Sequence, residues 1–285
     1  MILVKKSLYT TFYFFVFTSI YIALVAVGMV HQTALLFNTN LSFPFYVFVF
    51  AGTLCSYNFH WYFTNVTDDS TIDAKAAWHI RYRHIHLAIA LCSLLASGYF
   101  AFHLLQQWVW LALTALFVFL YSAPKVPLAP FNRLKKVAYG KTVFLALAWM
   151  HVTTMLPMLI QKLEWQMPHY LFALNRFFLI YAICILFDLR DQEQDQKEGI
   201  KSMITQMGKA QVSVIYYGIL IFWAITTIWL AFYFTVGVVL ALLLPGLMLL
   251  IGYKWLKRQQ SHFVYYVLLD GLMVISYPLM LLFRF

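Results

Sequence analysis

The chain has 285 residues, of which 63% are apolar, 19% aromatic and only 11% charged. Soluble globular domains carry about 25% charged residues, so this composition excludes an ordinary soluble fold and indicates a polytopic membrane protein. The formal charge of +10 then fits loops that face anionic lipid or a phosphorylated ligand, and it does not call for a nucleic-acid partner.

Nine apolar runs approach or exceed the length of about 20 residues that a helix needs to cross a bilayer. We expect them at 8–30, 41–63, 85–106, 107–122, 142–161, 169–188, 211–231, 233–252 and 263–283. The first run is too long for the core of a signal peptide, so we expect it to be retained. The predicted fold is an all-α, polytopic bundle of nine transmembrane helices, and the chain 1–285 is expected to form a single transmembrane domain.

The basic residues give an independent test of this map. If the N-terminus is cytoplasmic, all but three of the 20 basic residues fall on that side, as the positive-inside rule requires. The exceptions are Lys162, Arg176 and Arg284, and we expect the first two to snorkel to the outer interface. The loops that share the cytoplasmic face are those near 64–84, 123–141, 189–210 and 253–262. We therefore expect an integral protein of a bacterial plasma membrane.

Polar residues gather at the end of the second predicted span and in the loop after it. Asn58 lies near the cytoplasmic interface, where it can bond a neighbouring helix or face a ligand. The loop carries Asp68, Asp69 and Asp73, which could orient a metal-bound anion or be solvated. The histidines that follow form one loose group, so we do not predict a histidine metal site.

Five basic residues lie in the loop after the fourth predicted span, which begins with Tyr-Ser-Ala-Pro at 121–124. They are Lys125, Arg133, Lys135, Lys136 and Lys141. Arg offers bidentate contacts to phosphate and Lys a point charge, so Lys125, Arg133 and Lys141 form a candidate anion clamp. Topogenic charge is the alternative explanation. Lys141 is the most suggestive, because it opens the fifth span and can point into the bundle.

Five of the ten acidic residues lie within 188–202, directly after the sixth predicted span. They are Asp188, Asp191, Glu193, Asp195 and Glu198. If the helix continues, all but Glu193 share one face, and neither Arg190 nor Lys197 lies on it. Mutual repulsion would then make Asp→Asn variants as stable as the parent or slightly more so without metal. Mg2+ that shares its shell with phosphate oxygens would suit these acids; a solvated helix end, stopped by Gly199, is the alternative.

The order of these motifs in a nine-helix chain resembles the UbiA family of intramembrane prenyltransferases. The matching residues are Tyr-Ser-x-Pro at 121–124 and Asp-x-x-Asp-x-Glu-x-Asp-x-x-x-Gly-Ile-Lys-Ser at 188–202. In that family, two aspartate motifs hold Mg2+ and a prenyl diphosphate at the cytoplasmic mouth of a lipid-facing cavity. The resemblance implies that Asp191 and Asp195 are catalytic and bind Mg2+ together with Asp188. It implies that Asn58, Tyr121 and Lys201 help to hold the substrate, and the anion clamp of Lys125, Arg133 and Lys141 inferred from the loop charges would complete this set.

The first aspartate motif departs from the family pattern Asn-Asp-x-x-Asp-x-x-x-Asp. Asn58 is kept, but the positions of the three aspartates are taken by Phe59, Tyr62 and Val66. Acids of the following loop could substitute for them, or the protein could use a single metal cluster.

We therefore expect a membrane enzyme that transfers a prenyl group from a prenyl diphosphate to an acceptor with the help of Mg2+. The acceptor is not identified by the sequence. The alternative is a non-catalytic relative that binds a lipid or isoprenoid as a carrier or assembly subunit. A third interpretation is a small-solute transporter, and its one candidate residue is Asp270, which lies deep in the last span. A structural hydrogen bond would explain the presence of this acid equally well.

Overall fold

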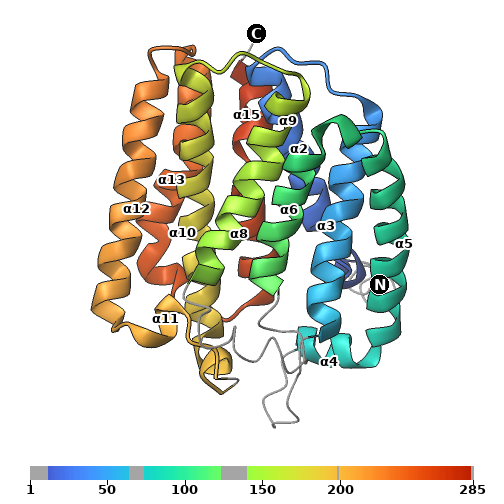
Figure 1. The fold of residues 1–285 in the computed structure, drawn as a ribbon. Helices are drawn as coiled ribbons and strands as arrows, with labels where there is room; N and C mark the ends of the chain where they lie inside the picture. The colour runs from blue at the N-terminus through green and yellow to red at the C-terminus, as the bar shows by residue number, and fades with distance from the viewer. Residues whose placement is uncertain (1–11, 64–73, 123–139, 198, 284–285) are drawn as a thin grey trace, which may run out of the picture. The chain divides into compact units, whose positions relative to one another are not determined.

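The computed structural model describes residues 12–63, 74–122, 140–197 and 199–283, and this part of the chain contains helices and no strand (Figure 1). Its longer helices are α2 (Ile20–Leu36), α3 (Phe43–Phe63), α4 (Ala74–Arg81), α5 (Arg83–Phe102), α6 (Trp108–Ser122), α8 (Lys141–Met150), α10 (Met167–Lys197), α12 (Lys209–Leu230), α13 (Val236–Leu256) and α15 (Ser276–Phe283). The shorter elements are η1 (Leu105–Gln107), η5 (His151–Met155), α9 (Leu156–Ile160), α11 (Met203–Gln206), η6 (Val264–Leu269) and α14 (Asp270–Leu272). The all-α fold class is confirmed for these residues.

Six segments of the described chain are long and apolar enough to cross a membrane, so the protein is an integral membrane protein. They are Arg83–Phe102, Leu105–Ser122, Lys141–Ile160, Met167–Glu193, Lys209–Leu230 and Val236–Leu256. The pair Val264–Leu272 and Ser276–Leu282, bent by 47°, adds a seventh if it forms one crossing. The predicted count of nine spans is not confirmed.

The first two predicted spans account for the difference. The run at 8–30 is interrupted at Ser19, whose φ of 65° lies in the left-handed region that ends a helix. α2 begins after this break and has 17 residues, about one turn fewer than a bilayer needs. α3 begins two residues after the start of the predicted run, ends at the predicted residue and has 21 residues, but Asn58 and His60 near its end lower its mean hydropathy.

The described helices gather into two compact units. The first contains the described residues of Met1–Val27 and Ser42–Gln106, and the second those of Gly28–Leu41 and Gln107–Phe285, so that α2 contributes to both. In the first unit α3 packs against α5, and in the second α10 packs against α8 and α12. The single domain inferred from the sequence stays a prediction.

Within the second unit, α10 lies between α8 and α12 (Figure 1). Side chains on every face of its middle turns are buried, among them Ile180, Ile183, Ile185 and Leu186, each at most 1% exposed. A helix that is apolar all round is stable only inside a bundle. This burial holds the axis of α10 inside the unit and brings its polar end to the surface of the packed helices.

A buried arginine joins α10 to α2 and to the π-helix η5. Arg176 is 4% exposed, and its guanidinium donates to four acceptors: the carbonyl oxygens of Met29 and Thr153, Thr33 Oγ1 and Gln32 Oε1, at 2.9, 2.8, 3.0 and 2.6 Å. The Thr153 carbonyl needs such a donor because its α-helical partner would be Pro157, which has no N–H. The prediction that Arg176 snorkels to the outer interface is therefore wrong: acceptors inside the protein replace water.

Candidate functional site

α10 continues past its apolar run into the acidic stretch, as the sequence predicts, and ends at Lys197. Gly199 stops it with a φ of 72°, a conformation that favours glycine. The Gly199 amide donates to the Gln196 carbonyl at 3.1 Å and the Ile200 amide to the Asp195 carbonyl at 2.9 Å. These two bonds form a Schellman motif, which satisfies carbonyls that the helix end would otherwise leave unpaired.

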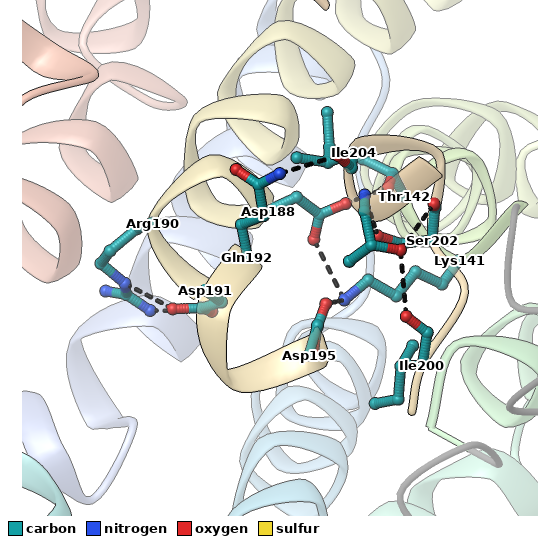
Figure 2. Close-up of polar contacts among 11 residues, drawn as sticks. Lys141, Thr142, Asp188, Arg190, Asp191, Gln192, Asp195, Ile200, Ser202 and Ile204 are labelled. Atoms are coloured by element: carbon teal, nitrogen blue, oxygen red, sulfur yellow. Dashed lines mark hydrogen bonds and ion pairs between the residues drawn. The ribbon is translucent and has the colours of Figure 1, made fainter. Parts of the chain in front are cut away.

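The carboxylates of this helix end point in two directions, as Figure 2 shows. Asp188 and Asp195 face Lys141, whereas Asp191 faces Arg190. At about 100° per residue, Asp188 and Asp195 differ by only about 20° around the helix, while Asp191 is rotated about 60° from Asp188. The single acidic face predicted from the spacing is therefore divided between two basic partners.

Lys141 joins the two inward carboxylates. Its Nζ donates to Asp195 Oδ2 and lies 3.3 Å from Asp188 Oδ1, and the Thr142 hydroxyl donates to Asp188 Oδ2. The side chains of Lys141, Asp188 and Asp195 are only 10%, 12% and 3% exposed. The prediction that Lys141 points into the bundle is confirmed. The sequence places no basic residue of α10 on the acidic face, and the partner of Asp188 and Asp195 is instead a lysine of α8, which spacing along α10 does not reveal.

Arg190 holds the outward carboxylate. Its Nε donates to Asp191 Oδ1 at 2.7 Å and its second terminal nitrogen to Asp191 Oδ2 at 3.1 Å. The guanidinium also lies over the rings of Tyr265 and Tyr266, 4.6 and 4.7 Å from their centroids, which adds cation–π attraction. The Arg190 side chain is 11% exposed and that of Asp191 45%. Arg190 therefore fixes the orientation of the Asp191 carboxylate, which remains accessible to solvent.

The first residue of α8 is a lysine, and a positive charge at the N-terminus of a helix is electrostatically unfavourable. Lys141 is the first residue of α8, and the first turn of that helix has no acid. A cation at a helix N-terminus opposes the helix dipole by about 0.3–1 kcal/mol, so the carboxylates of α10 are needed to hold it. Tyr121, in the last turn of α6, lies close enough to interact with the charges of Lys141 and Asp188. Basic and acidic groups of α8 and α10 are thus paired at one end of the second unit, with a phenol of α6 within electrostatic range.

Residues 77–264, more than half of the chain, match the model of the UbiA prenyltransferase family. The chain belongs to the UbiA prenyltransferase family. The matched region of this UbiA protein includes Tyr121, Lys141 and the whole of 188–202, and it begins after Asn58. No curated protein and no solved structure matches the chain.

In this UbiA protein, Asn58 belongs to a buried polar network of the first unit. Asn58 Nδ2 donates to the carbonyls of Leu54 and Thr18 at 2.8 and 3.0 Å, and its Oδ1 lies 2.6 Å from His86 Nδ1. Because an amide oxygen only accepts, His86 carries a proton on Nδ1. The other nitrogen of His86 faces His79 Nδ1, so a neutral His86 accepts a bond from His79. Asn58, His86 and His79 are 0%, 1% and 4% exposed.

Aromatic contacts surround this network where the family pattern has aspartates. The His79 ring stacks on Trp61 with centroids 4.2 Å apart and an interplanar angle of 11°. Tyr62, at one of the aspartate positions, lies beneath the Arg83 guanidinium at 4.6 Å. Phe59, at another, stacks with Phe63 at 5.9 Å. Imidazole and aromatic groups therefore fill this part of the unit, and the interhelix bond weighed for Asn58 is the one observed.

The remaining predicted residues divide by position. Lys201 is exposed in the turn after Gly199, while Lys125, Arg133 and the loop acids Asp68, Asp69 and Asp73 lie outside the described residues, as does Val66. Asp270 is 8% exposed at the start of α14, and its role stays open between the alternatives given above.

Sequence reasoning missed several polar groups that shape the site. Thr142, which bonds Asp188, is adjacent to Lys141 and could have been found as its neighbour. Ser202 caps α11 by accepting from the Thr205 amide at 3.3 Å, and Gln192 Nε2 donates to the Ile204 carbonyl at 3.1 Å. The bond from Gln192 holds the segment after Gly199 against α10. The sequence Gly-Ile-Lys-Ser at 199–202 could have indicated this arrangement, because a glycine that ends one helix is followed by a serine that can cap the next.

The donor set can be compared with what Mg2+ requires. Among the described residues, no group of three or more His, Cys, Asp or Glu side chains converges to hold a metal ion. Asp188 and Asp195 nevertheless converge on one cation, the Lys141 ammonium, and they supply the hard carboxylate oxygens that Mg2+ prefers. Mg2+ commonly takes one or two protein carboxylates and completes its shell with water and phosphate. These two aspartates therefore fit the ion, whereas Asp191 is bound to Arg190.

Proposed function

We propose that this protein is a membrane prenyltransferase that uses Mg2+ to transfer a prenyl group from a prenyl diphosphate to an acceptor. The observation that carries this proposal is the convergence of Asp188 and Asp195 on a cation at the polar end of α10, in a chain of the UbiA family. The acceptor is an unidentified nucleophile that shares the bilayer with the prenyl chain.

The chain's own residues suit both ends of such a substrate. The apolar surfaces of the helices accommodate an isoprenoid tail, and the polar end of α10 lies beside Lys141 and Tyr121 for the diphosphate. Loss of diphosphate leaves an allylic cation, and basic groups favour that step because they stabilise the leaving group as its charge develops. Bound Mg2+ would supply Lewis-acid neutralisation of the diphosphate. Lys125, Arg133 and Lys201 are proposed to complete the phosphate contacts.

The proposal includes the full predicted topology. We infer nine crossings, with a bent last crossing and with the N-terminus and the motif loops on the cytoplasmic side of a bacterial plasma membrane. The distribution of basic residues supports this orientation. It would place residues 189–210 and the loop 123–141 in the same compartment as the water-soluble diphosphate.

The direct test is binding of prenyl diphosphates of different chain lengths to the purified protein in nanodiscs, with Mg2+ or with EDTA. Mg2+-dependent binding is expected, and Asp188→Asn and Asp195→Asn should each abolish it. Asp191→Asn, at the outward carboxylate, should weaken or abolish binding if the family's assignment of this residue applies. Equal binding by the parent and all three variants would refute the site assignment.

The second candidate function is that of a non-catalytic family member that binds an isoprenoid or another lipid as a carrier or assembly subunit. It is favoured by the first motif, where Phe59 and Tyr62 replace aspartates and Asn58 makes three bonds within its unit. Chemistry separates the two proposals. A prenyltransferase releases diphosphate in the presence of Mg2+ and a competent acceptor extract, whereas a carrier binds the prenyl diphosphate and returns it unchanged.

A further inference from the structure

Lys141 occupies the place between Asp188 and Asp195 that a divalent ion held by this pair would need. We propose that Lys141 is a tethered competitor of that ion. In the metal-free protein it holds the two carboxylates together; when they take a divalent cation, its ammonium leaves them and becomes a ligand for the diphosphate. This inference rests on the proposed function and adds an exchange step that decides when Lys141 is available.

The charges favour the exchange. Asp188, Asp195 and Lys141 together carry one net negative charge, on side chains that are 12%, 3% and 10% exposed. Two carboxylates that share one ammonium repel each other, and this repulsion is strong where screening by water is weak. A divalent cation would neutralise the two carboxylates completely. The displaced ammonium would lose its contacts with the carboxylates and gain contacts with the diphosphate that binds beside the ion.

The covalent structure permits the movement. Lys141 has a flexible four-carbon stem and a compact ammonium, so its charge can move while α8 stays in place. It is also the first residue of that helix, where the helix dipole favours an anion over a cation. Thr142 can keep its bond to Asp188 during the exchange, because its hydroxyl contacts the other oxygen of that carboxylate.

The second basic partner offers an internal contrast. Arg190 is held by two bonds to Asp191 and by the faces of Tyr265 and Tyr266. Several directional contacts would have to break before its guanidinium could leave. Lys141 has no such aromatic support among the contacts described for it. The exchangeable cation of the site is therefore Lys141 rather than Arg190.

The first experiment measures Mn2+ binding by electron paramagnetic resonance on the full chain in nanodiscs, with Mn2+ as the only ligand. Lys141→Met keeps the length of the side chain and removes the competitor, so it should bind Mn2+ about tenfold more tightly or better. Lys197→Met removes an exposed charge from the same helix as the two aspartates and should change the affinity by no more than about twofold. With Mn2+ saturating, Lys141→Met should bind inorganic diphosphate more weakly than the parent.

The second experiment needs no variant and covers the case in which Lys141→Met does not fold. Reductive methylation followed by mass spectrometry reports how accessible each lysine amine is. Mg2+ alone should raise the labelled fraction of Lys141 several-fold, while that of Lys197 should stay constant.

The outcomes separate the two proposals. Mn2+ bound equally by the parent and Lys141→Met, or Lys141 labelling that does not respond to Mg2+ while metal is bound, would overturn the exchange and leave the metal site standing. No metal binding by either folded protein would overturn the Mg2+-dependent function, and the exchange with it. Tighter Mn2+ binding together with weaker diphosphate binding supports the exchange.

Discussion

Replacing Asp195 by asparagine should destabilise the metal-free protein, which reverses the expectation from like-charge repulsion along α10. Removing one partner of a buried ion pair costs about 3–5 kcal/mol, and Asp195 is only 3% exposed beside Lys141. Two features reduce this loss. Asp188 Oδ1 remains 3.3 Å from the Lys141 ammonium, and the amide oxygen of the substituted side chain can still accept one bond. We therefore expect the free energy of unfolding to fall by about 2–3 kcal/mol.

The matched control is Asp191→Asn on the same helix. The Arg190 side chain is 11% exposed but the Asp191 carboxylate is 45% exposed, so water reaches the pair from the side of the acid. The loss should lie between that of an exposed and that of a buried pair, and we expect the free energy of unfolding to fall by about 1–2 kcal/mol, less than for Asp195→Asn. Both variants and the parent are unfolded by SDS titration from mixed micelles with EDTA, followed by tryptophan fluorescence. A double-mutant cycle with Lys141→Met should give a coupling energy of about 1–3 kcal/mol for the 141–195 pair. Equal or greater stability of Asp195→Asn would refute the pairing and restore the repulsion argument.

Three further predictions concern other parts of the molecule. Arg176→Leu should lower the free energy of unfolding by about 2–5 kcal/mol, because four buried acceptors lose the guanidinium, although the Thr33 hydroxyl still donates to the Thr153 carbonyl. Arg258→Leu, at an exposed site, should change the free energy of unfolding by about 0.5 kcal/mol or less in the same SDS titration. Asn58→Leu should cost about 1–3 kcal/mol by loss of its bonds to Thr18, Leu54 and His86, and a thermal shift equal to the parent's would contradict the network. Single cysteines at 130 and 201 should react with an impermeant maleimide from the same side of the membrane, and labelling from opposite sides would disprove the predicted topology.

The helices of this protein could be predicted from sequence wherever an apolar run was long and uninterrupted. α3, α6, α8 with α9, and α12 begin and end within a few residues of the predicted runs, because the length of a span is set by the bilayer. The continuation of α10 to Lys197 was also predictable from the spacing of its acids and from Gly199. The break at Ser19 was not, since no glycine or proline marks it.

The partners of the charged residues could not be predicted in the same way. Spacing along α10 places Asp188 and Asp195 on one face, but Lys141 reaches that face from a helix that begins 47 positions before Asp188. Asp191 pairs with the residue before it, a contact that helical periodicity does not suggest. Arg176 looks like an interfacial residue until its four acceptors are known. Tertiary packing determines each of these contacts, and the spacing of residues along one helix does not show which other helices pack against it.

Pro157 has a consequence for how this sequence can change over time. Its missing N–H leaves the Thr153 carbonyl to be satisfied by the Thr33 hydroxyl at 2.6 Å and by Arg176 at 2.8 Å. A substitution that restores an N–H at position 157 would supply an intrahelical donor and make part of the arginine's role redundant. Positions 157 and 176 are therefore expected to covary among descendants of this sequence, and Pro157→Ala to act as a partial genetic suppressor of Arg176→Leu.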